Sequence, residues 1–288
     1  MARQRLGQHF LADIDWREQI ARAIGVSPHS PLRFGSTPAH TASTSAESSP
    51  ALDATYCWIE VGAGHGEMTE HLVSTGAPVY AIELDSLLIA RLQRLAKKSP
   101  NLTIIPGDVL ETELAAIAAG RRIRLYGNLP YYITSPILHH FFTFADQIDE
   151  IHIVIQEEVA HRLAAKPQTR DYGYLSVVTQ LYTRPEFVLQ IPRSAFSPPP
   201  EVGSALVTLR LPGERVNLAL RDVGAFPEFV KVCFSQKRKT LVNNLRALAS
   251  PEAVREILAA QNLRPDARAE QLSVSQFAAV HDSLTSES

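Results

Sequence analysis

The sequence predicts an α/β protein: a Rossmann-like domain built on a mostly parallel seven-stranded sheet, followed by a small all-helical C-terminal domain. Three observations carry this prediction. Short apolar runs alternate with helical periodicity through the first two thirds of the chain, two further strand-like runs follow, and the strand signal stops near Pro212. We therefore expect a first domain over residues 1–211 and a second over residues 212–288.

Most of the expected strands are short, apolar on both faces and followed by a turn or helix signal, which is typical of strands buried in a parallel sheet. They are residues 56–61, 79–82, 102–105, 123–126 and 151–155. Leucines at helical spacing predict a helix between the second and third of them: Leu84, Leu87, Leu88, Leu92 and Leu95. Two more runs, around residues 186–191 and 205–211, flank a proline-rich segment and suit an antiparallel hairpin at the end of the sheet.

Beyond Pro212 the apolar residues recur at helical spacing: Phe226, Phe229, Val230, Cys233 and Phe234, then Leu241, Leu245 and Leu248. Ser250-Pro251 predicts a helix start with proline at its first position, and Ser273 with Gln276 predicts a capping box. Residues 28–54 differ from both domains, because they are rich in Ser, Thr, Pro and Ala and carry almost no large apolar side chain. We expect a low-complexity surface insertion there.

Composition is that of an ordinary globular protein, with 45% hydrophobic and 20% charged residues. The N-terminus is polar and basic, and no apolar run reaches roughly 18 residues, so we expect neither a signal peptide nor a membrane span. Cys57 and Cys233 match no disulfide framework or metal-ligand spacing and are expected to be buried thiols in a reducing cytoplasm. The net charge of −2 argues mildly against a nucleic-acid partner, although net charge averages over faces.

A glycine-rich turn, residues 60–66, follows the first strand of the sheet and precedes a helix. Glycines allow the backbone to turn tightly and to approach a ligand closely at the positive end of a helix. The G-x-G-x-G spacing differs from the dinucleotide-binding fingerprint, and the Lys-Ser/Thr of a P-loop is absent. Gly62 and Gly64 are therefore candidate cofactor-binding residues, and a purely structural turn is the alternative.

Carboxylates follow the next two strands. Glu83 lies about 20 residues after the glycines, where an acidic residue can hold a ribose diol by bidentate hydrogen bonding. In a second interpretation, Asp85 is the ribose ligand and Glu83 caps a helix. In a third, both residues are only N-caps. Asp108 follows the third strand and suits an exocyclic adenine amine. Since these positions share one edge of a parallel sheet, they predict a crevice for an adenosine-containing cofactor.

The tetrapeptide Asn128-Leu129-Pro130-Tyr131 follows the fourth strand and predicts the chemistry. The exocyclic amine of adenine is a poor nucleophile, because its lone pair is delocalised into the ring. The amide oxygen of Asn128 and the main-chain carbonyl of Leu129 would accept its two N–H groups and favour a pyramidal nitrogen facing a sulfonium methyl. Pro130 fixes the turn, and Tyr131 offers an aromatic face for stacking. Catalysis would be mostly positioning, and a structural turn is the alternative.

With these motifs the sequence resembles the ribosomal RNA dimethyladenosine transferase family, and within it the bacterial KsgA/RsmA branch. The resemblance covers nearly the whole chain apart from the insertion. It rests on the glycine turn, the tetrapeptide, Ile82-Glu83-Leu84-Asp85, Gly107-Asp108, Gly7-Gln8-His9-Phe10-Leu11, residues 195–205 with their run of three prolines, and Phe234-Ser235-Gln236-Lys237-Arg238-Lys239-Thr240.

The resemblance implies S-adenosyl-L-methionine as the cofactor, contacted by the residues that match His9, Leu11, Gly62, Glu83, Asp108 and Asn128. It implies that Phe196 closes over the target adenine opposite Tyr131. It also implies transfer of four methyl groups to two adjacent adenines in the hairpin loop near the 3′ end of 16S rRNA, within a small ribosomal subunit or its precursor. We expect a cytoplasmic monomer. His9 stands where many members have Asn, and Tyr132 where others carry a polar residue, so the latter is expected to tune the pocket wall.

A basic stretch answers the question of net charge. The segment 231–246 contains five basic residues and no acidic one: Lys231, Lys237, Arg238, Lys239 and Arg246. In the family the C-terminal helical domain helps to grip rRNA, so we expect Lys237, Arg238, Lys239 and Arg246 to bind RNA. A solvated helix face is the alternative.

Other functions remain in competition. Relatives that methylate one adenine of 23S rRNA and give macrolide resistance share the cofactor motifs and the tetrapeptide, but the prolines after Phe196 and the basic stretch favour the 16S branch. A DNA adenine methyltransferase more often carries Asp or Asn followed by Pro-Pro-Tyr, which is absent. A non-catalytic RNA-binding assembly factor is the third alternative, and retention of the cofactor residues argues against it.

Overall fold

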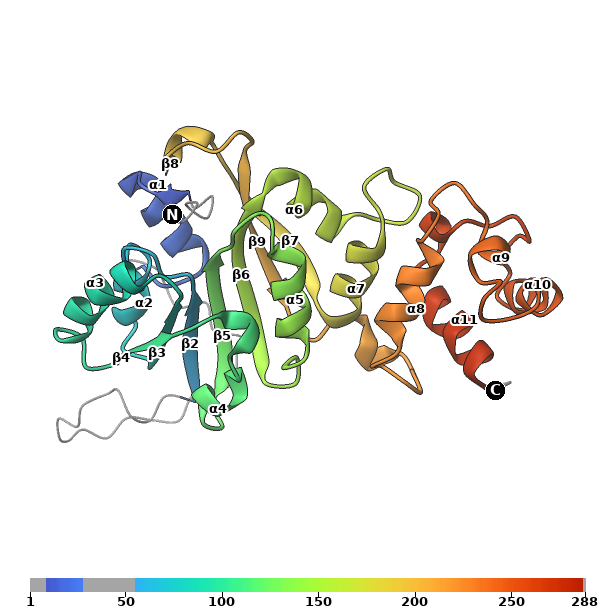
Figure 1. Cartoon of the computed structure of the whole chain (residues 1–288), viewed down its shortest axis with the longest axis horizontal. Helices are drawn as coiled ribbons and strands as arrows, with labels where there is room; N and C mark the ends of the chain where they lie inside the picture. The colour runs from blue at the N-terminus through green and yellow to red at the C-terminus, as the bar shows by residue number, and fades with distance from the viewer. Residues whose placement is uncertain (1–8, 28–54, 287–288) are drawn as a thin grey trace, which may run out of the picture. The chain divides into compact units, whose positions relative to one another are not determined.

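The structure, a computed structural model, describes residues 9–27 and 55–286 (Figure 1). The expected insertion over residues 28–54 lies outside the described residues, as do Gly7 and Gln8 of the N-terminal motif. The chain divides into two compact units, residues 1–157 with 188–208 and residues 158–187 with 209–288. The second unit thus takes in residues 158–187, whereas the sequence pattern places the domain boundary at residue 211. That boundary stays a prediction.

A seven-stranded sheet with the order β4-β3-β2-β5-β6-β9-β7 forms the framework (Figure 1). Its strands are β2 (Tyr56–Val61), β3 (Val79–Glu83), β4 (Leu102–Pro106), β5 (Arg122–Asn128), β6 (Ile148–Gln156), β7 (Arg184–Ile191) and β9 (Ser204–Arg210). Strand β2 pairs in parallel with β3 and β5, and the parallel run continues to β4 on one side and β6 on the other. The predicted mostly parallel seven-stranded sheet is confirmed, with β9 and β7 next to each other at one end.

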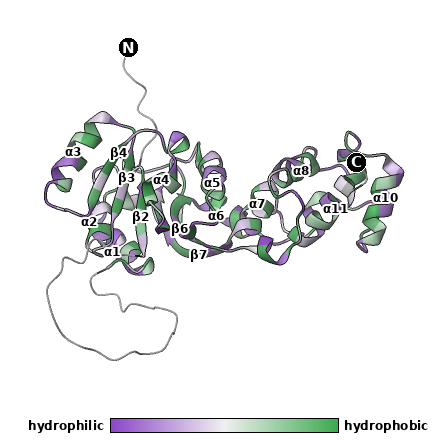
Figure 2. Ribbon diagram, turned by 90° about the horizontal axis from the view of Figure 1, so that it is seen from below, coloured by the Kyte–Doolittle hydropathy of each residue, from purple (hydrophilic) through white to green (hydrophobic). Residues whose placement is uncertain are grey.

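The strands of the sheet centre are buried on both faces, as their uninterrupted apolar sequences predict. Ile59, Leu125 and Ile153 are fully buried, and hydrophobic colour concentrates in the strands in Figure 2. Burying side chains of this kind contributes on the order of 1.5–3 kcal/mol each. The carboxyl ends of these parallel strands therefore meet at one fixed edge, and the loops that follow them are held there.

Helices and short 3₁₀ turns of the first unit follow the strands: α1 (Ile14–Ala23), α2 (Thr69–Val73), α3 (Ser86–Ala96), η1 (Val109–Glu111), α4 (Leu114–Ala118) and α5 (Thr134–Phe142). The predicted helix after β3 is present as α3, and Leu92 is fully buried on its inner face. Leu84 and Leu87 are exposed, however, at 59% and 81%. Leu84 precedes the helix and Leu87 lies in its first turn, so the buried face is narrower than the leucine spacing predicts.

A second, two-stranded sheet was not predicted. It joins β1 (Phe10–Leu11) to β8 (Phe196–Ser197) in antiparallel register, with Leu11 opposite Phe196. The main-chain N–H groups of Ala12 and Asp13 donate to the carbonyl of Ala195, at 2.9 and 3.1 Å. The start of the described chain is therefore fixed against a segment that lies almost 190 residues later, next to the turn η2 (Arg193–Ala195).

The second unit is mainly helical, as the pattern beyond Pro212 predicts. Its elements are α6 (Glu157–Ala164), α7 (Tyr174–Tyr182), η3 (Glu214–Asn217), α8 (Phe226–Cys233), α9 (Leu241–Asn244), α10 (Pro251–Ala260), η4 (Ala269–Gln271) and α11 (Val274–Ser286). The apolar face of α8 is buried as predicted. The cap of α10 is confirmed, because Ser250 Oγ accepts from the N–H of Ala253. The capping box of Ser273 and Gln276 is also present.

Two smaller predictions about the core have different outcomes. Cys57 and Cys233 are both buried free thiols, as expected. Leu248 is 53% exposed, so the apolar face predicted through Leu241 and Leu245 ends at Leu245.

Within the described ranges, none of the helices has the length and apolar character needed to cross a membrane.

Candidate active site

The predicted ligand-binding residues follow four neighbouring parallel strands. Gly62 follows β2, Glu83 ends β3, Asp108 follows β4 and Asn128 ends β5. A pocket opens at this edge, and its lining is His9, Phe10, Gly62, Gly64, Asn128, Leu129, Pro130 and Tyr131. The structure therefore brings the glycine turn, the tetrapeptide and the N-terminal motif together in one place, although they are distant in sequence.

The glycine turn needs glycine for its backbone conformation. Gly62 and Gly64 have φ values of +67° and +59°, in the left-handed region that L side chains rarely adopt. A Cβ atom on Gly64 would also lie 3.2 Å from the ring of Phe10. The N–H of Gly64 donates to Glu83 Oε2 at 2.9 Å, so the end of β3 holds the turn in place.

Glu83 is 3% exposed and directs most of its hydrogen-bonding capacity to the protein backbone. Its Oε1 accepts from the N–H groups of Leu84 and Asp85, both at 2.9 Å, and its Oε2 accepts from Gly64. A carboxylate offers about four acceptor sites. Glu83 can therefore hold one ribose hydroxyl in this conformation, and a bidentate grip on the diol requires one of the backbone bonds to break.

The two aspartates at this edge both cap helical turns. Asp85 Oδ1 accepts from the N–H of Leu87 at 2.8 Å and caps α3, which is the N-cap alternative for Asp85. Asp108 Oδ1 accepts from the N–H of Leu110 at 2.9 Å and caps η1. Over residues 9–27 and 55–286, no group donates to Asp108 Oδ2. That oxygen is free to accept from an amine.

The side-chain amide of Asn128 has a fixed orientation. Its Nδ2 donates to the main-chain carbonyl of His9 at 2.8 Å, and a carbonyl can only accept, so the oxygen Oδ1 must point away from that contact. No donor from the described part of the chain reaches Oδ1. The N–H of Leu129 donates to the carbonyl of Val154 at 3.0 Å, which ties the tetrapeptide to β6. The pocket thus contains an oriented, unpaired acceptor.

Two contacts hold the side chain of Tyr131, one at its hydroxyl and one at its ring. Its hydroxyl is 2.6 Å from Ser204 Oγ, and its ring stacks on the ring of His9 with centroids 5.7 Å apart at 28°. Burial raises the pKa of Tyr131 and the Ser204 bond lowers it, with burial the larger effect, so the phenol is neutral near pH 7. His9 Nδ1 donates to the carbonyl of Pro198 at 2.8 Å. The neighbouring Tyr132 is 61% exposed and does not line the pocket.

Leu11 and Phe196 lie in the hydrophobic core and do not line the pocket. They are 5% and 2% exposed and pack in one cluster with Tyr126, Ile191 and Leu206. The carbonyl of Leu11 accepts from Arg17 Nε at 2.7 Å. Stacking of Phe196 on a target adenine would require its side chain to leave this cluster, and its role stays a prediction, as does that of Leu11.

A buried carboxyl lies at the start of the glycine turn, near the end of β2. Glu60 is 2% exposed, and its Oε2 accepts from Thr69 Oγ1 at 2.5 Å. Burial raises the pKa of Glu60 to about 8, the Thr69 bond opposes the shift, and the charges of Glu67 and Glu83 add to it. Glu60 is therefore mostly protonated at neutral pH and links β2 to α2 as a neutral acid.

Two residues of the site were missed by sequence reasoning. Phe10 lines the pocket and contacts Gly64, and Ser204 holds the hydroxyl of Tyr131. Both lie within runs that carry the family resemblance, so the motif signal includes them. Their roles depend on which side chain they face, and a single sequence does not show that.

The predicted RNA-binding residues lie in the second unit. Lys237, Arg238 and Lys239 occupy the connection between α8 and α9, and Arg246 follows α9. All four are exposed, and none forms an ion pair within the described ranges. Because these residues lie in connections and not along one helix, the alternative of a solvated helix face is less well supported. Lys231, by contrast, lies on α8 and pairs with Glu228 at 3.1 Å.

Comparison with known proteins identifies the family of this chain. The family model described as ribosomal RNA adenine dimethylase matches residues 1–286. Among similar proteins named ribosomal RNA small subunit methyltransferase A, that of Koribacter versatilis is 35% identical over 97% of this chain and 93% of its own length. The Xanthomonas campestris pv. campestris (strain B100) protein is 37% identical over 96% and 94%, and that of Acidobacterium capsulatum 41% over 78% and 80%.

Solved structures agree on the fold. A dimethyladenosine transferase from Plasmodium falciparum superposes with a TM-score of 0.63 at 23% identity, over 78% of this chain and 88% of that one. The 23S rRNA methyltransferase ErmE superposes with a TM-score of 0.61 at 24% identity, over 96% and 99%. Because the family model matches residues 1–286, this chain belongs to the ribosomal RNA adenine dimethylase family.

Proposed function

We propose that this enzyme dimethylates the N6 amines of two adjacent adenines in the 3′-terminal hairpin loop of 16S rRNA, in the cytoplasm, during biogenesis of the small ribosomal subunit. Family membership and the small-subunit activity named for its relatives support this proposal. The single observation that supports the chemistry is the oriented amide of Asn128, whose Oδ1 lies beside the glycine turn and accepts from no group of the described residues.

The residues at the strand ends fit S-adenosyl-L-methionine. Among the described residues, no atom lies within 4 Å of the position of a Cβ atom on Gly62, so a ligand can approach its backbone closely. Glu83 retains capacity for one ribose hydroxyl, and Asp108 Oδ2 suits an exocyclic adenine amine. His9 and Asn128 line the same pocket. When bound, the cofactor supplies a methyl group on a positively charged sulfur.

The protein's part in the reaction is to position the target amine. Asn128 Oδ1 and the carbonyl of Leu129 accept its two N–H groups, which favours a pyramidal nitrogen whose lone pair is no longer delocalised into the ring. Tyr131 stacks on the base, and its bond to Ser204 keeps the ring from rotating away. No base stronger than water is required, because the proton leaves after the nitrogen becomes cationic. Orientation of this kind supplies the rate enhancement.

The second methylation differs from the first. A monomethylated amine has one N–H left, so only one of the two acceptors, Asn128 Oδ1 or the Leu129 carbonyl, retains a donor. Stacking on Tyr131 must then contribute a larger share of the orientation. An unstacked loop is the suitable substrate, because its bases are cheap to extrude into a pocket.

Mass spectrometry of rRNA tests the proposal. Small subunits that lack the modification are incubated with the purified protein and methyl-labelled cofactor, and the 16S rRNA is digested and sequenced by mass. Two adjacent labelled dimethyladenosines near the 3′ end are expected, from a protein that sediments as a monomer. Label in 23S rRNA of large subunits would assign the chain to the other branch, and no label in either RNA would refute the proposal.

A further inference from the structure

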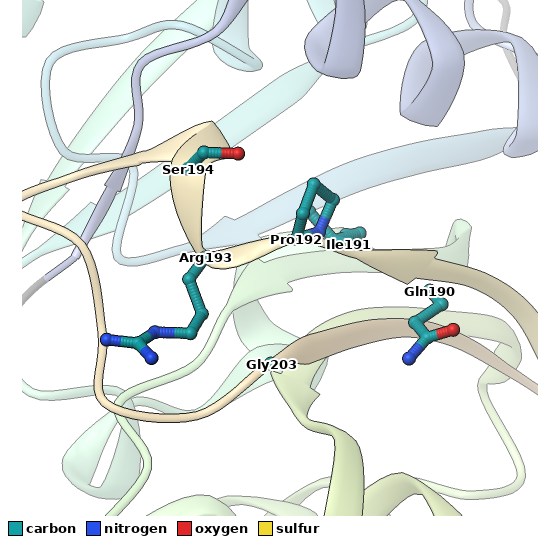
Figure 3. A pocket seen from close by; sticks show the side chains of 6 residues that line it. All are labelled: Gln190, Ile191, Pro192, Arg193, Ser194 and Gly203. Atoms are coloured by element: carbon teal, nitrogen blue, oxygen red, sulfur yellow. The ribbon is translucent and has the colours of Figure 1, made fainter.

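A second hollow lies at the end of β7, outside the candidate active site. Its volume is about 520 Å³, and its lining is Gln190, Ile191, Pro192, Arg193, Ser194 and Gly203 (Figure 3). The function proposed above uses none of these residues. The hollow lies entirely within the first unit, which also holds the active site.

The segment 196–204 connects the hollow to the active site. On the active-site side, Ser204 Oγ bonds the hydroxyl of Tyr131 at 2.6 Å. The carbonyl of Pro198 accepts from His9 Nδ1 at 2.8 Å. The segment therefore contacts both aromatic rings that stack in the pocket.

On its other side the same segment borders the hollow. The carbonyl of Pro200 accepts from Arg193 Nε at 2.7 Å, and Gly203 is part of the lining. Since Gly203 directly precedes Ser204, the hollow begins one residue away from the partner of Tyr131. An RNA strand that inserts one base at Tyr131 can therefore reach this segment with a neighbouring nucleotide.

Gln190 presents an oriented amide in the hollow. Its Nε2 donates one hydrogen to Glu157 Oε1 at 2.8 Å, which leaves Oε1 as an acceptor and one N–H as a donor. Glu157 is itself fixed, because its main-chain N–H donates to the carbonyl of Gly203 at 3.0 Å. A Cβ atom on Gly203 would lie 2.8 Å from Glu157 Oε2, so the glycine permits this close contact. One donor beside one acceptor is complementary to the N6 and N7 edge of adenine.

Arg193 supplies positive charge at the other end of the hollow. Its Nε bonds Pro200, and neither Nη atom has a partner in the described part of the chain. Figure 3 shows the side chains of Arg193 and Gln190 on the same side of the chain with Gly203 between them, whereas Ser194 points away. An exposed guanidinium with free Nη groups is suited to a phosphate, which it can bind through two parallel hydrogen bonds.

We propose that this hollow binds the adenine next to the target adenine, with Gln190 on its N6 and N7 edge and Arg193 on its phosphate. The inference rests on the proposed function, since it takes RNA with two adjacent adenines as the substrate. Guanine presents acceptors at both O6 and N7 and gives the Gln190 oxygen no donor. Dimethylated adenine also has no N6 hydrogen, so the hollow distinguishes an unmodified neighbour from a finished one.

Small subunits with altered loops test the base contact. Unmodified subunits carry either two adenines or one adenine and one guanine, in both orders, and methylation of each adenine is followed by mass spectrometry. The wild-type enzyme is expected to favour an adenine neighbour by about 5- to 100-fold in kcat/KM, in at least one order. Gln190→Ala removes this preference. Gln93→Ala, which changes an exposed glutamine on α3, leaves it intact.

Arg193 is tested separately, because its bond to Pro200 could serve only to position the segment. Arg193→Ala is expected to lower kcat/KM on both kinds of subunit and to reduce the dependence of kcat/KM on salt concentration. Arg193→Lys keeps the charge and restores most of the activity if the group binds phosphate. A lysine variant as impaired as the alanine variant would overturn the phosphate contact.

The outcomes separate this inference from the function on which it rests. If the wild-type protein methylates no subunit, the proposed function fails. If it methylates subunits with two adenines and with adenine–guanine pairs equally well, the function stands and only the hollow's role is refuted. Equal preference in wild type and Gln190→Ala refutes the assignment to Gln190, with cofactor affinity and melting temperature showing that the variant is folded.

Discussion

The active-site edge of the first unit and the basic connection of the second unit are built on different principles. At the edge, Asn128, Tyr131 and Gly64 are each fixed by a hydrogen bond to a residue distant in sequence. In the connection, Lys237 and Lys239 are exposed and have no ionic partner within the described ranges. The first region is a set of oriented acceptors, and the second is a set of charges.

This difference matches the role proposed for each region. A methyl acceptor must be oriented to within fractions of an ångström, and a side chain that moves freely cannot do so. Binding of a phosphate backbone depends on charge and counterion release, which tolerate flexible side chains. We therefore expect substitutions at the edge to act on rate with little effect on binding, and substitutions in the connection to act on binding alone.

Asn128→Ala is expected to have the largest effect. It removes the oriented acceptor and the bond to the His9 carbonyl together, so we expect methylation to fall by about 100-fold or more. Single-turnover incorporation of labelled methyl groups into small subunits measures the rate, and filter binding measures affinity for subunits. A decrease in subunit binding in proportion to the decrease in rate would contradict a positioning role.

Tyr131 comes next in expected effect. Tyr131→Ala removes the stacking surface, and we expect a decrease of about 5- to 100-fold in kcat/KM. Tyr131→Phe keeps the ring and removes only the Ser204 bond, so a few-fold decrease is expected. Ser204→Ala should match the phenylalanine variant, and the double variant should be no worse than either single one. Additive decreases would mean that the two hydroxyls act independently.

The basic connection is tested by replacing Lys237, Arg238 and Lys239 with Ala. Subunit binding should weaken, and the slope of log affinity against log salt should fall by about one for each phosphate that the variant no longer binds. Affinity for the cofactor should hold. The matched control is the triple variant of Arg94, Lys97 and Lys98, two lysines and an arginine exposed at the end of α3. If both triple variants bind subunits equally weakly, the effect is one of net charge and not of the basic connection.

The last prediction concerns stability and not methylation, and it is made at Glu60. Because its folded pKa is about 8 and its ordinary value 4.5, the folded chain holds a proton that the unfolded chain has released between these values. Stability therefore falls as pH rises from about 5 to 8 and levels off above the folded pKa. Glu60→Gln has no such proton and should show a flatter curve of melting temperature against pH. A parallel curve would place the pKa of Glu60 near its ordinary value.

Local sequence signals predicted the framework well. The strands of the sheet were correctly predicted from apolar runs, and the caps at Ser250 and Ser273 from residue types at fixed spacing. These features depend on neighbours within one turn or one strand, so a single sequence contains the information. The faces of the helices were less well predicted, because Leu87 and Leu248 have helical spacing and yet are mostly exposed.

By itself the sequence determined the order of strands along the chain, the glycine turn and the tetrapeptide, since each is a short pattern whose residue types limit its chemistry. Only the tertiary structure decided which groups those residues face. The pairing of β1 with β8 brings His9 to Asn128 and Tyr131, and it buries Phe196 in the core. Contacts between segments almost 190 residues apart have no local signature, because their stability comes from packing that forms only when the whole sheet is in place.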